Sequence, residues 1–491
     1  MHRRAICATL AILMGGCTVG PDFHAPDPPA VAAFTKDPLP DETETASVAG
    51  GQAQRFVQGR DIPGEWWELF HSQPLNALIE QSLKTSPSLQ AAQAALRVAM
   101  ENIRAQQGLA FPLLTVGFGA SRNQNADQVS PALASSVRLY NLYQGQLNAS
   151  WTLDVFGANR RQVEALQALA DGQRYQLEAT YLALTANVVA AAVQEASLRA
   201  QIAAAEEVIT DESDALMIMR RQNASGQIAG ADVAAQEAAL AQVQQVVPLL
   251  RKQLAQQRDL LTALAGRFPA EEIEETFELS ALELPEELPV SLPSRLIEQR
   301  PDIRIAEENL HAASAQIGVA VANRLPNLTL SANEGTVATT LGELFQPGNA
   351  FWSVGANLAQ PLFDGGTLLH RTRAAEAAYD QTASAYRVTV IGAFQNVADA
   401  LHALQSDAEA LKAAAASEAA AARSLNIVRR QLELGQIAYL GLLTAQQTYQ
   451  QALINRLQVQ ASRYVDTATL FQALGGGWWN RSDVLIGEQS R

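Results

Sequence analysis

The feature that most constrains the fold of this chain is an internal duplication. Short motifs of the first half recur in the second half in the same order, 207 to 214 residues later. This spacing is far longer than the roughly 20–50 residues of a solenoid repeat, so each half is one complete structural unit. The matched pairs are Ser86–Leu89 with Arg300–Ile303, Val155–Gly157 with Leu362–Gly365, and Arg220–Gln222 with Arg429–Gln431.

Both halves contain long stretches rich in Ala, Gln and Leu, which favour helix. Hydrophobic residues make up 48% of the chain and aromatic residues only 6%, so these helices must pack closely through small side chains. A helix over 157–224 would be about 100 Å long at 1.5 Å per residue and has to be bundled with others. We predict helices at 75–110, 157–224 and 231–267 in the first half and at 297–323, 366–434 and 437–473 in the second.

Four segments alternate between apolar and polar residues, which predicts strands with one apolar and one polar face. They are Tyr143–Val155 and three segments at 114–121, 327–333 and 352–359. Strands of about ten residues can cross a bilayer when tilted, and the amides and hydroxyls of the polar faces suit a water-filled lumen. We therefore favour membrane strands over a soluble amphipathic hairpin, with Trp151 and Trp352 in an aromatic girdle.

The number of strands requires an oligomer. Four strands cannot close a barrel, and an open sheet edge is not tolerated in lipid. Known membrane barrels begin at about eight strands. A dimer would supply eight strands and a trimer twelve, and the pattern alone favours the trimer only weakly.

The first residues are typical of a bacterial lipoprotein signal. Arg3 and Arg4 precede the short apolar segment Ala5–Met14, and two glycines precede Cys17. We predict cleavage before Cys17 and a covalent lipid such as palmitate on its thiol, although Met14 stands where Leu is usual. A plain signal peptide with a chance cysteine is the alternative. Because Thr18 rather than Asp follows the cysteine, we expect sorting to the outer membrane.

The domain organisation follows from these signals and from local composition. The segment 21–60 is rich in Pro, Asp and Ala, and 268–293 is rich in Glu and Pro, which indicates an extended tether and a solvated linker. We predict a signal peptide at 1–16, an acylated tether at 17–74, a first repeat at 75–267 with a hairpin at 112–156, a linker or equatorial segment at 268–296, a second repeat at 297–473 with a hairpin at 326–362, and a flexible tail at 474–491.

Several classes of function are disfavoured. The net charge of −15 argues against binding to nucleic acid, which needs a basic face. No 18 uninterrupted apolar residues occur, so we expect no transmembrane helix. The histidines form no helical metal pair, and no phosphate loop or catalytic constellation can be proposed. We therefore expect neither an enzyme nor a cofactor or metal, apart from the lipid on Cys17.

Four ordered motifs resemble signatures of the TolC-type outer-membrane efflux channel family, and best its NodT/OprM-like lipoprotein branch. They are Gly16–Phe23, Ser150–Gly157, Arg300–Arg304 and Pro361–Gly366. The resemblance implies a homotrimer with a twelve-stranded outer-membrane β-barrel, four strands from each chain, continued by a long periplasmic α-helical barrel. It also implies a periplasmic adaptor and an inner-membrane pump, most often of the RND type. The channel would be a passive exit duct for drugs or other small molecules.

In this family the turns between the long helices form tips that close the periplasmic end and contact the adaptor. Gly-containing breaks between apolar-periodic helices also predict turns here from turn chemistry alone. An ordinary interhelical turn without a partner is the alternative. The matching positions are Gly226, Gln227, Ile228 and Ala229 in the first repeat and Gly435, Gln436, Ile437 and Ala438 in the second.

The periplasmic gate departs from the family pattern. Members often carry acidic residues just after the second tip, but Gly441 and Thr444 occupy those positions here, and only the first repeat keeps an acid, Asp232. We therefore do not expect an acidic ring from the second tip. Instead, we predict an apolar constriction that gates by dewetting. The candidate gate residues are Asp232, Tyr439, Leu440, Leu443 and Thr444.

The strand-to-helix turns carry a further group of candidates, namely Phe156, Gly157, Phe363, Asp364 and Gly365. We favour a capping role for Asp364 over a role in transport. Two alternatives to drug efflux remain open: a duct for type I protein secretion, and a periplasmic coiled-coil lipoprotein that spaces two membranes. The second does not explain four alternating strands at matching places in both halves.

Overall fold

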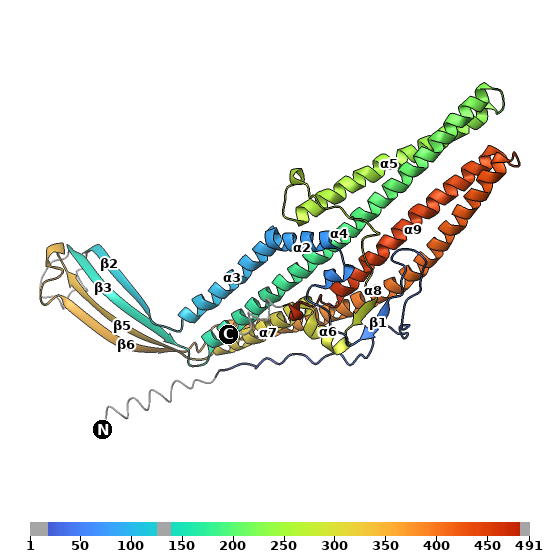
Figure 1. Cartoon of the computed structure of the whole chain (residues 1–491). Coiled ribbons are helices and arrows are strands. Elements are labelled where there is room, and N and C mark those ends of the chain that lie inside the picture. The colour runs from blue at the N-terminus through green and yellow to red at the C-terminus, as the bar shows by residue number, and fades with distance from the viewer. Residues whose placement is uncertain (1–17, 125–138, 482–491) are drawn as a thin grey trace. The chain divides into compact units, whose positions relative to one another are not determined.

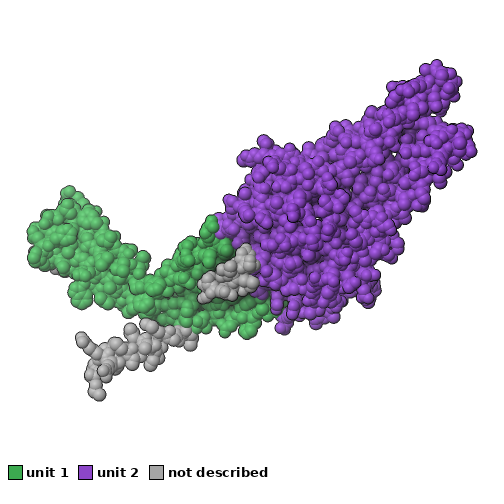
Figure 2. All heavy atoms as spheres, in the orientation of Figure 1, with its two compact units in different colours: residues 1–26, 95–174, 305–387 green, residues 27–94, 175–304, 388–491 purple. Residues whose placement is uncertain are grey.

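The structure is a computed structural model of the chain and describes residues 18–124 and 139–481. The predicted signal peptide and Cys17 lie outside the described residues. The chain forms two compact units (Figure 2). We call residues 1–26, 95–174 and 305–387 the sheet unit, and residues 27–94, 175–304 and 388–491 the helical unit.

The two halves of the chain fold alike, element for element (Figure 1). Four pairs of corresponding elements have equal lengths, as expected of a duplicated chain. Helices α3 (Pro87–Gly108) and α7 (Pro301–Ala322) have 22 residues each, strands β2 (Leu113–Gln124) and β5 (Asn327–Ala338) 12, helices α4 (Ala158–Ala224) and α8 (Thr367–Glu433) 67, and helices α5 (Gly230–Leu264) and α9 (Tyr439–Ala473) 35.

The first helix of each repeat is broken, and the prediction of single helices at 75–110 and 297–323 was wrong. Helix α2 (Gln73–Thr85) ends at Ser86, whose ψ is 121°, and α6 (Pro293–Gln299) ends at Arg300, whose ψ is 122°. Each residue precedes a proline, and the proline ring disfavours helical ψ in its predecessor. The motif that revealed the duplication is therefore a helix break in both halves.

The sheet unit contains a four-stranded antiparallel sheet in the order β2-β3-β5-β6, with β3 at Leu139–Leu153 and β6 at Ala350–Ala359. A short 3-10 turn, η3 (Leu341–Glu343), lies between β5 and β6. The register places the apolar residues of neighbouring strands opposite one another, for example Ala149 opposite Leu114 and Ala332. One face of the sheet is therefore apolar across all four strands.

The helical unit includes the second half of the predicted tether, which is part of the core rather than an extended surface segment. Strand β1 (Arg55–Gln58) pairs in parallel with β4 (Glu287–Val290), and η1 (Trp66–Phe70) is buried. The Trp66 ring stacks on Phe471 with centroids 5.3 Å apart. The aromatic side chains that are scarce elsewhere concentrate here, and their burial holds the segment in place.

The predicted linker at 268–296 is also packed, not solvated. Besides η2 (Pro269–Glu271) and β4, it contributes a series of buried side chains between its exposed glutamates. The spacing of these apolar residues is irregular, so neither helical nor strand periodicity marked them in the sequence. They are Ile273, Phe277, Leu279, Leu282, Leu284, Leu288 and Val290.

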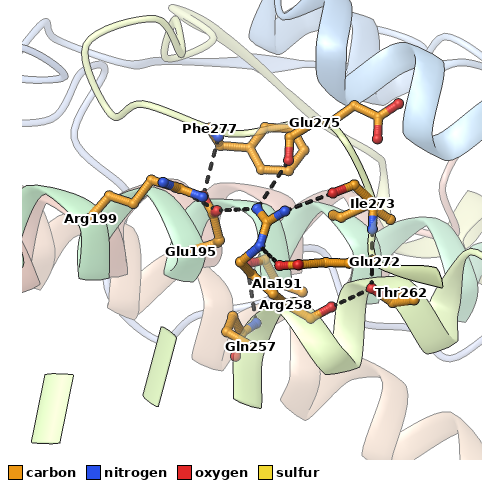
Figure 3. Close-up of polar contacts among 10 residues, drawn as sticks. All are labelled: Ala191, Glu195, Arg199, Gln257, Arg258, Thr262, Glu272, Ile273, Glu275 and Phe277. Carbon is orange, nitrogen blue, oxygen red and sulfur yellow. Dashed lines mark hydrogen bonds and ion pairs between the residues drawn. The ribbon is translucent and has the colours of Figure 1, made fainter. Parts of the chain in front are cut away.

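A buried ion pair holds this segment against the helices (Figure 3). Arg258 on α5 donates to the carboxylate of Glu195 on α4 at 3.0 Å. The same guanidinium donates to the backbone oxygens of Ile273 and Glu275 at 2.7 and 3.2 Å. The fully buried Glu195 carboxylate in turn accepts the backbone N–H of Phe277 at 3.2 Å. One charged pair thus supplies partners for backbone groups that no sheet or helix satisfies.

The described part of the C-terminal tail, up to residue 481, is docked, so the prediction of a flexible tail was wrong there. Gly475–Gly477 all have positive φ and end α9. A short 3-10 turn, η4 (Trp478–Asn480), follows, and the Trp478 indole N–H donates to the Gln299 oxygen at 2.7 Å. The Arg481 guanidinium lies 3.7 Å from the ring centre of Tyr181.

Among the described residues, α4 is the one helix long and apolar enough to cross a membrane. More than half of the apolar stretch, 56%, is buried within the structure. Length and composition are weak evidence for a span, because the core helix of a soluble domain passes the same test.

Candidate functional site

The apolar face of the sheet is exposed. Val116 on β2 is 86% exposed, Val354 on β6 is 74% exposed and Trp352 is 77% exposed. In addition, β2 and β6 are the two edge strands of the sheet, and each is hydrogen-bonded to another strand on one side only. Exposed apolar surface and open edges together call for another partner, because each is unfavourable in water.

The opposite face is polar and uncharged over most of its length. Gln144 and Gln146 share it and are hydrogen-bonded at 2.5 Å, and Thr152 lies opposite Thr329 with hydroxyls 3.3 Å apart. Two charged residues lie on the apolar face. Glu334 has the register partners Leu147 and Trp352, and Arg122, near the end of β2, lies opposite Asn141. The sheet therefore divides into one water-compatible face and one lipid-compatible face that contains a single carboxylate.

The strand-to-helix turns are capped by aspartates. Asp154 accepts the backbone N–H groups of Asn159 and Arg160 at 3.1 and 2.9 Å. Asp364 accepts those of Leu368 and Gly366, both at 2.8 Å, and these hydrogen bonds lower the pKa of Asp364. Both aspartates therefore stabilise helix starts, because they satisfy N–H groups that lack helical partners.

The other residues predicted at these turns differ in their surroundings. Phe363 is 93% exposed beside Gly365, which has a φ of 66°. On the first repeat, the Phe156 oxygen accepts the backbone N–H of Val19 at 3.2 Å, and Gly157 has a φ of 82°. The first turn is thus covered by the amino-terminal segment.

The two tips have the same backbone structure and lie at the same end of the helical unit (Figure 1). Gly226 and Gly435 have φ of 75° and 69°. The next N–H bonds back across the turn in both, from Gln227 to Gln222 at 2.9 Å and from Gln436 to Gln431 at 2.8 Å. This is the glycine-dependent helix ending that turn chemistry predicts. Gln227, Ala229, Gln436 and Ala438 are exposed, and Ile228 and Ile437 are half-buried.

A hydrogen bond joins the two helix pairs just behind the tips. The Tyr439 hydroxyl on α9 donates to Gln236 Oε1 on α5 at 2.7 Å, and Gln236 Nε2 donates to the backbone oxygen of Glu212 on α4 at 3.0 Å. Gln236 is fully buried. Burial, and secondly the charge of Glu212, raise the pKa of Tyr439 to about 12, so its hydroxyl stays protonated at neutral pH.

Glu212 itself is 1% exposed, and neither carboxylate oxygen has a hydrogen-bond partner among the described residues. Burial and the neighbouring Asp211 raise its pKa. A buried carboxylate without a hydrogen-bond partner therefore lies beside the Tyr439–Gln236 contact between the repeats.

The structure separates the three residues of the predicted apolar constriction. Leu440 is 66% exposed, whereas Leu443 is only 8% exposed and Tyr439 turns toward Gln236. Leu443 is therefore buried within the single chain, and its place in the gate stays a prediction. Asp232 is half-buried in the first turn of α5, and Thr444 is exposed with its hydroxyl bound to the Leu440 oxygen.

The family model for outer membrane efflux proteins matches residues 78–267 and 292–476, which together make up well over half of the chain. The chain belongs to the outer membrane efflux protein family. The two matched segments coincide with the two repeats. This is a family of efflux proteins rather than enzymes, and its members are outer-membrane proteins.

Relatives of this efflux protein span nearly its whole length. The antibiotic efflux pump outer membrane protein ArpC of Pseudomonas putida is 29% identical over 480 residues, which cover 97% of this chain and 96% of ArpC. The pyoverdine export outer membrane protein OpmQ of Pseudomonas putida is 28% identical over 449 residues, covering 90% and 94%. Two relatives of similar identity are thus named for different molecules, an antibiotic and pyoverdine.

The fold matches that of a solved efflux channel. The outer-membrane channel OprN superposes with a TM-score of 0.82 at 26% identity and covers 94% of this chain and all of OprN. The long helix pairs and the four-stranded sheet of this efflux protein therefore belong to a known channel fold. Within the described residues, no group of three or more His, Cys, Asp or Glu could hold a metal.

Sequence reasoning missed several residues that organise the site. Gln236 and Glu212 lie on uninterrupted helices, where a single amide or carboxylate resembles any surface residue. Arg161, in the first turn of α4, is buried although its neighbour Arg160 is exposed. For Arg161, one signal was available in the sequence. The motif Gly16–Phe23 extends beyond the cysteine, and its last residues had no predicted role.

Proposed function

We propose that three copies of this chain close their sheets into a twelve-stranded barrel in the outer membrane. The long helix pairs would continue as a periplasmic α-helical barrel, and the whole would be the passive exit duct of a tripartite efflux system. The observation that carries the proposal is the four-stranded sheet with two open edges and a continuous exposed apolar face. Pairing β2 of one copy with β6 of the next removes every edge, which lipid requires.

Small molecules are the proposed cargo. Relatives that match over most of this chain include proteins named for antibiotics, toluene or pyoverdine, which favours this cargo over secreted protein. The uncharged polar face would line the lumen and discriminate little among such molecules. Selection would therefore belong to the inner-membrane pump, for which we propose the RND type.

The tips are the proposed contact with a periplasmic adaptor. They expose Gln227 and Gln436 on turns of the same conformation, so an adaptor could bind both repeats in the same way. A photo-crosslinking amino acid at either position should capture the adaptor in the native host, and mass spectrometry would identify it. Leu249, exposed on the side of α5, is the matched control position. Equal capture from all three positions would contradict a tip-specific contact.

We also propose that Cys17 carries a lipid and is the mature amino terminus. Several acyl chains would anchor the chain stably, where a single chain binds only reversibly. The mass of the amino-terminal peptide from purified protein tests this directly. An unmodified thiol, or a peptide that still contains residues before Cys17, would contradict the proposal.

Two adjacent residues of β6 test the barrel. Val354 lies on the apolar face opposite Ala332, and Ser353 lies on the other face opposite Asn333. Val354→Lys places a charge in lipid at a cost of about 2–4 kcal/mol, whereas a lysine on the lumen side costs little. We expect native mass spectrometry to find the mass of three chains for Ser353→Lys and a much reduced trimer for Val354→Lys.

Conductance in planar bilayers provides the second measurement. Ser353→Lys should still insert and should shift the channel toward anions, because it adds three positive charges to the lumen. If the two variants assembled equally, or if Ser353→Lys alone prevented assembly, the assignment of the two faces would be wrong.

A further inference from the structure

Arg161 stands out among the basic residues of the sheet unit because it is buried. Its side chain is 5% exposed, although it lies in the first turn of α4. A buried guanidinium is costly unless its donors are satisfied, so the groups that it binds indicate what it is for. Most of them belong to the amino-terminal segment, about 140 residues away in the sequence.

The guanidinium holds this segment at three points. Nε donates to the Val19 oxygen at 3.1 Å, and Nη2 donates to Asp22 Oδ1 at 2.7 Å and to the Gly20 oxygen at 3.4 Å. The remaining terminal nitrogen, Nη1, donates to Glu164 Oε2 at 2.7 Å. The Arg161 side chain is therefore a bridge between α4 and residues 19–22.

A second contact extends the bridge to α7. The Phe23 ring stacks on His311 with centroids 4.4 Å apart and an interplanar angle of 12°. The His311 ring lies 3.2 Å from Glu164, the same carboxylate that binds Arg161. Residues 19–23 are thus fixed by one connected group of side chains on α4 and α7.

The backbone of the segment packs closely against the sheet unit at two glycines. Gly20 has a φ of 96°, and a Cβ built there would lie 2.4 Å from the Gly318 Cα on α7. A Cβ built at Gly157 would lie 2.9 Å from the Thr18 methyl group. Close approach at both ends, where only glycine fits, shows that the segment has a defined seat on the strand-to-helix turn.

We propose that Arg161 is the positioning residue for the lipid anchor: it fixes residues 19–22 so that the acylated amino terminus leaves the protein at the Phe156–Gly157 turn. This turn directly follows β3, where the apolar face of the sheet ends. Because consecutive Cα atoms are about 3.8 Å apart, a lipid on the residue before Thr18 starts beside the turn. The clamp then sets the anchor at the level at which the sheet enters the membrane. The inference rests on the proposed lipid at Cys17.

The alternative is a purely structural role, in which Arg161 stabilises the unit and the lipid alone determines where the amino terminus lies. The two roles differ in what happens to the segment when the guanidinium is removed. Under the positioning role the segment detaches although the lipid is present. Under the structural role the protein is less stable, but the segment keeps its place.

A nitroxide on Ala25→Cys distinguishes the two roles. Ala25 is exposed and follows the clamped residues. With Cys17 acylated, the introduced cysteine is the one free thiol of the mature chain. Protein purified from membranes would be placed in vesicles of phosphatidylethanolamine and phosphatidylglycerol. The spin-label mobility and its collision rates with oxygen and with a water-soluble nickel complex would then be measured.

We expect an immobilised label near the interface in the parent protein. In Arg161→Gln the mobile population should rise about tenfold, since several hydrogen bonds to a charged group are lost, and the collision rate with nickel should rise with it. Arg160→Gln is the matched control: it removes the neighbouring guanidinium, which lies 3.5 Å from Asp154, and should leave the label immobile. A label that is equally immobile in both variants, at the same depth, would overturn the proposal.

A second variant guards against misfolding of Arg161→Gln. Gly20→Val disrupts the seat from the side of the segment and changes no residue of α4 or α7, so it should release the label in the same way. The number of nitroxides per chain separates the two hypotheses. One nitroxide per chain, with a label that stays immobile in Arg161→Gln and in Gly20→Val, contradicts the clamp. Two nitroxides per chain mean instead that Cys17 is free and that the proposed lipid is absent.

Discussion

Buried charges fix the parts of the helical unit that have no regular secondary structure. We predict that Glu195→Ala lowers the free energy of unfolding by about 3 kcal/mol, because Arg258 and the Phe277 N–H lose a fully buried partner. Arg199→Ala removes the other partner of the same carboxylate, but Arg199 is 34% exposed and its loss should cost below about 1 kcal/mol. Urea unfolding of both variants measures the difference. Equal losses would mean that the buried pair is not the main support.

A pair of aspartates between α8 and α9 should make stability depend on pH. Burial, and secondly a hydrogen bond to Asp466, raise the pKa of Asp407 to about 7, against 3.8 for an ordinary aspartate. The folded state therefore binds this proton more tightly than the unfolded state. Its contribution to stability is fully present below about pH 4 and is lost as pH rises through about 7.

Asp407→Asn should remove this dependence. We expect the variant to be more stable than the parent at pH 8, by about 1–2 kcal/mol more than at pH 5, and equal to it only below about pH 4, as measured by urea midpoints. Glu409→Gln, on the exposed side of the same helix, is the control and should change neither value. A constant difference between variant and parent at both pH values would contradict the shifted pKa.

Residue-level prediction from sequence succeeded where the chemistry is local. Gly226 and Gly435 were recognised as turn residues because a positive φ requires little more than the glycine and its neighbours. Arg161, Gln236 and Glu195 could not be recognised, because their partners lie far away in the sequence. Their burial is decided only when the helices pack.

At the scale of helices, the contact behind the tips links the two repeats of one chain. Tyr439→Phe removes the hydroxyl and leaves the buried Gln236 amide oxygen unpaired, at a cost of about 1–2 kcal/mol to the contact between α5 and α9. We expect a higher leak current through the proposed duct in planar bilayers. Tyr449→Phe is the control, because Tyr449 packs on the same apolar cluster of α8 and α9. Leak from both variants alike would point to packing rather than to the hydrogen bond.

Long elements were predictable because their periodic patterns extend over many turns. The predicted strands and the four longest helices lie within a few residues of their observed positions, for example 157–224 against Ala158–Ala224. The segments that were misjudged are short or irregular. Trp66–Phe70 is a single 3-10 turn. The buried leucines of the linker are spaced irregularly among its glutamates. Packing against α9 and β1, not local pattern, places them in the core.

At the scale of the whole molecule, the open edges of the sheet indicate that one chain assembles with further copies. An oligomer could be predicted from the sequence, because four strands cannot close a barrel. The number of copies could not, because β2 and β6 pair with any copy whose edge is free. The twelve-stranded closure therefore remains a proposal that the relatives support and that an image of the particle can test.

Negative-stain microscopy of the detergent-purified protein tests the assembly as a whole. A trimeric duct should give end views with three-fold symmetry around a stain-filled centre and side views with a detergent belt at one end. The stem beyond the belt should be about 100 Å long, because α4 and α8 each have 67 residues that rise about 1.5 Å apiece. The periplasmic spacer alternative predicts instead a thin rod without a belt, because its strands would not lie in lipid. Val354→Lys sharpens the comparison: it should remove the belt and the three-fold views of a duct, whereas a rod that keeps its strands in water would look the same with or without the charge.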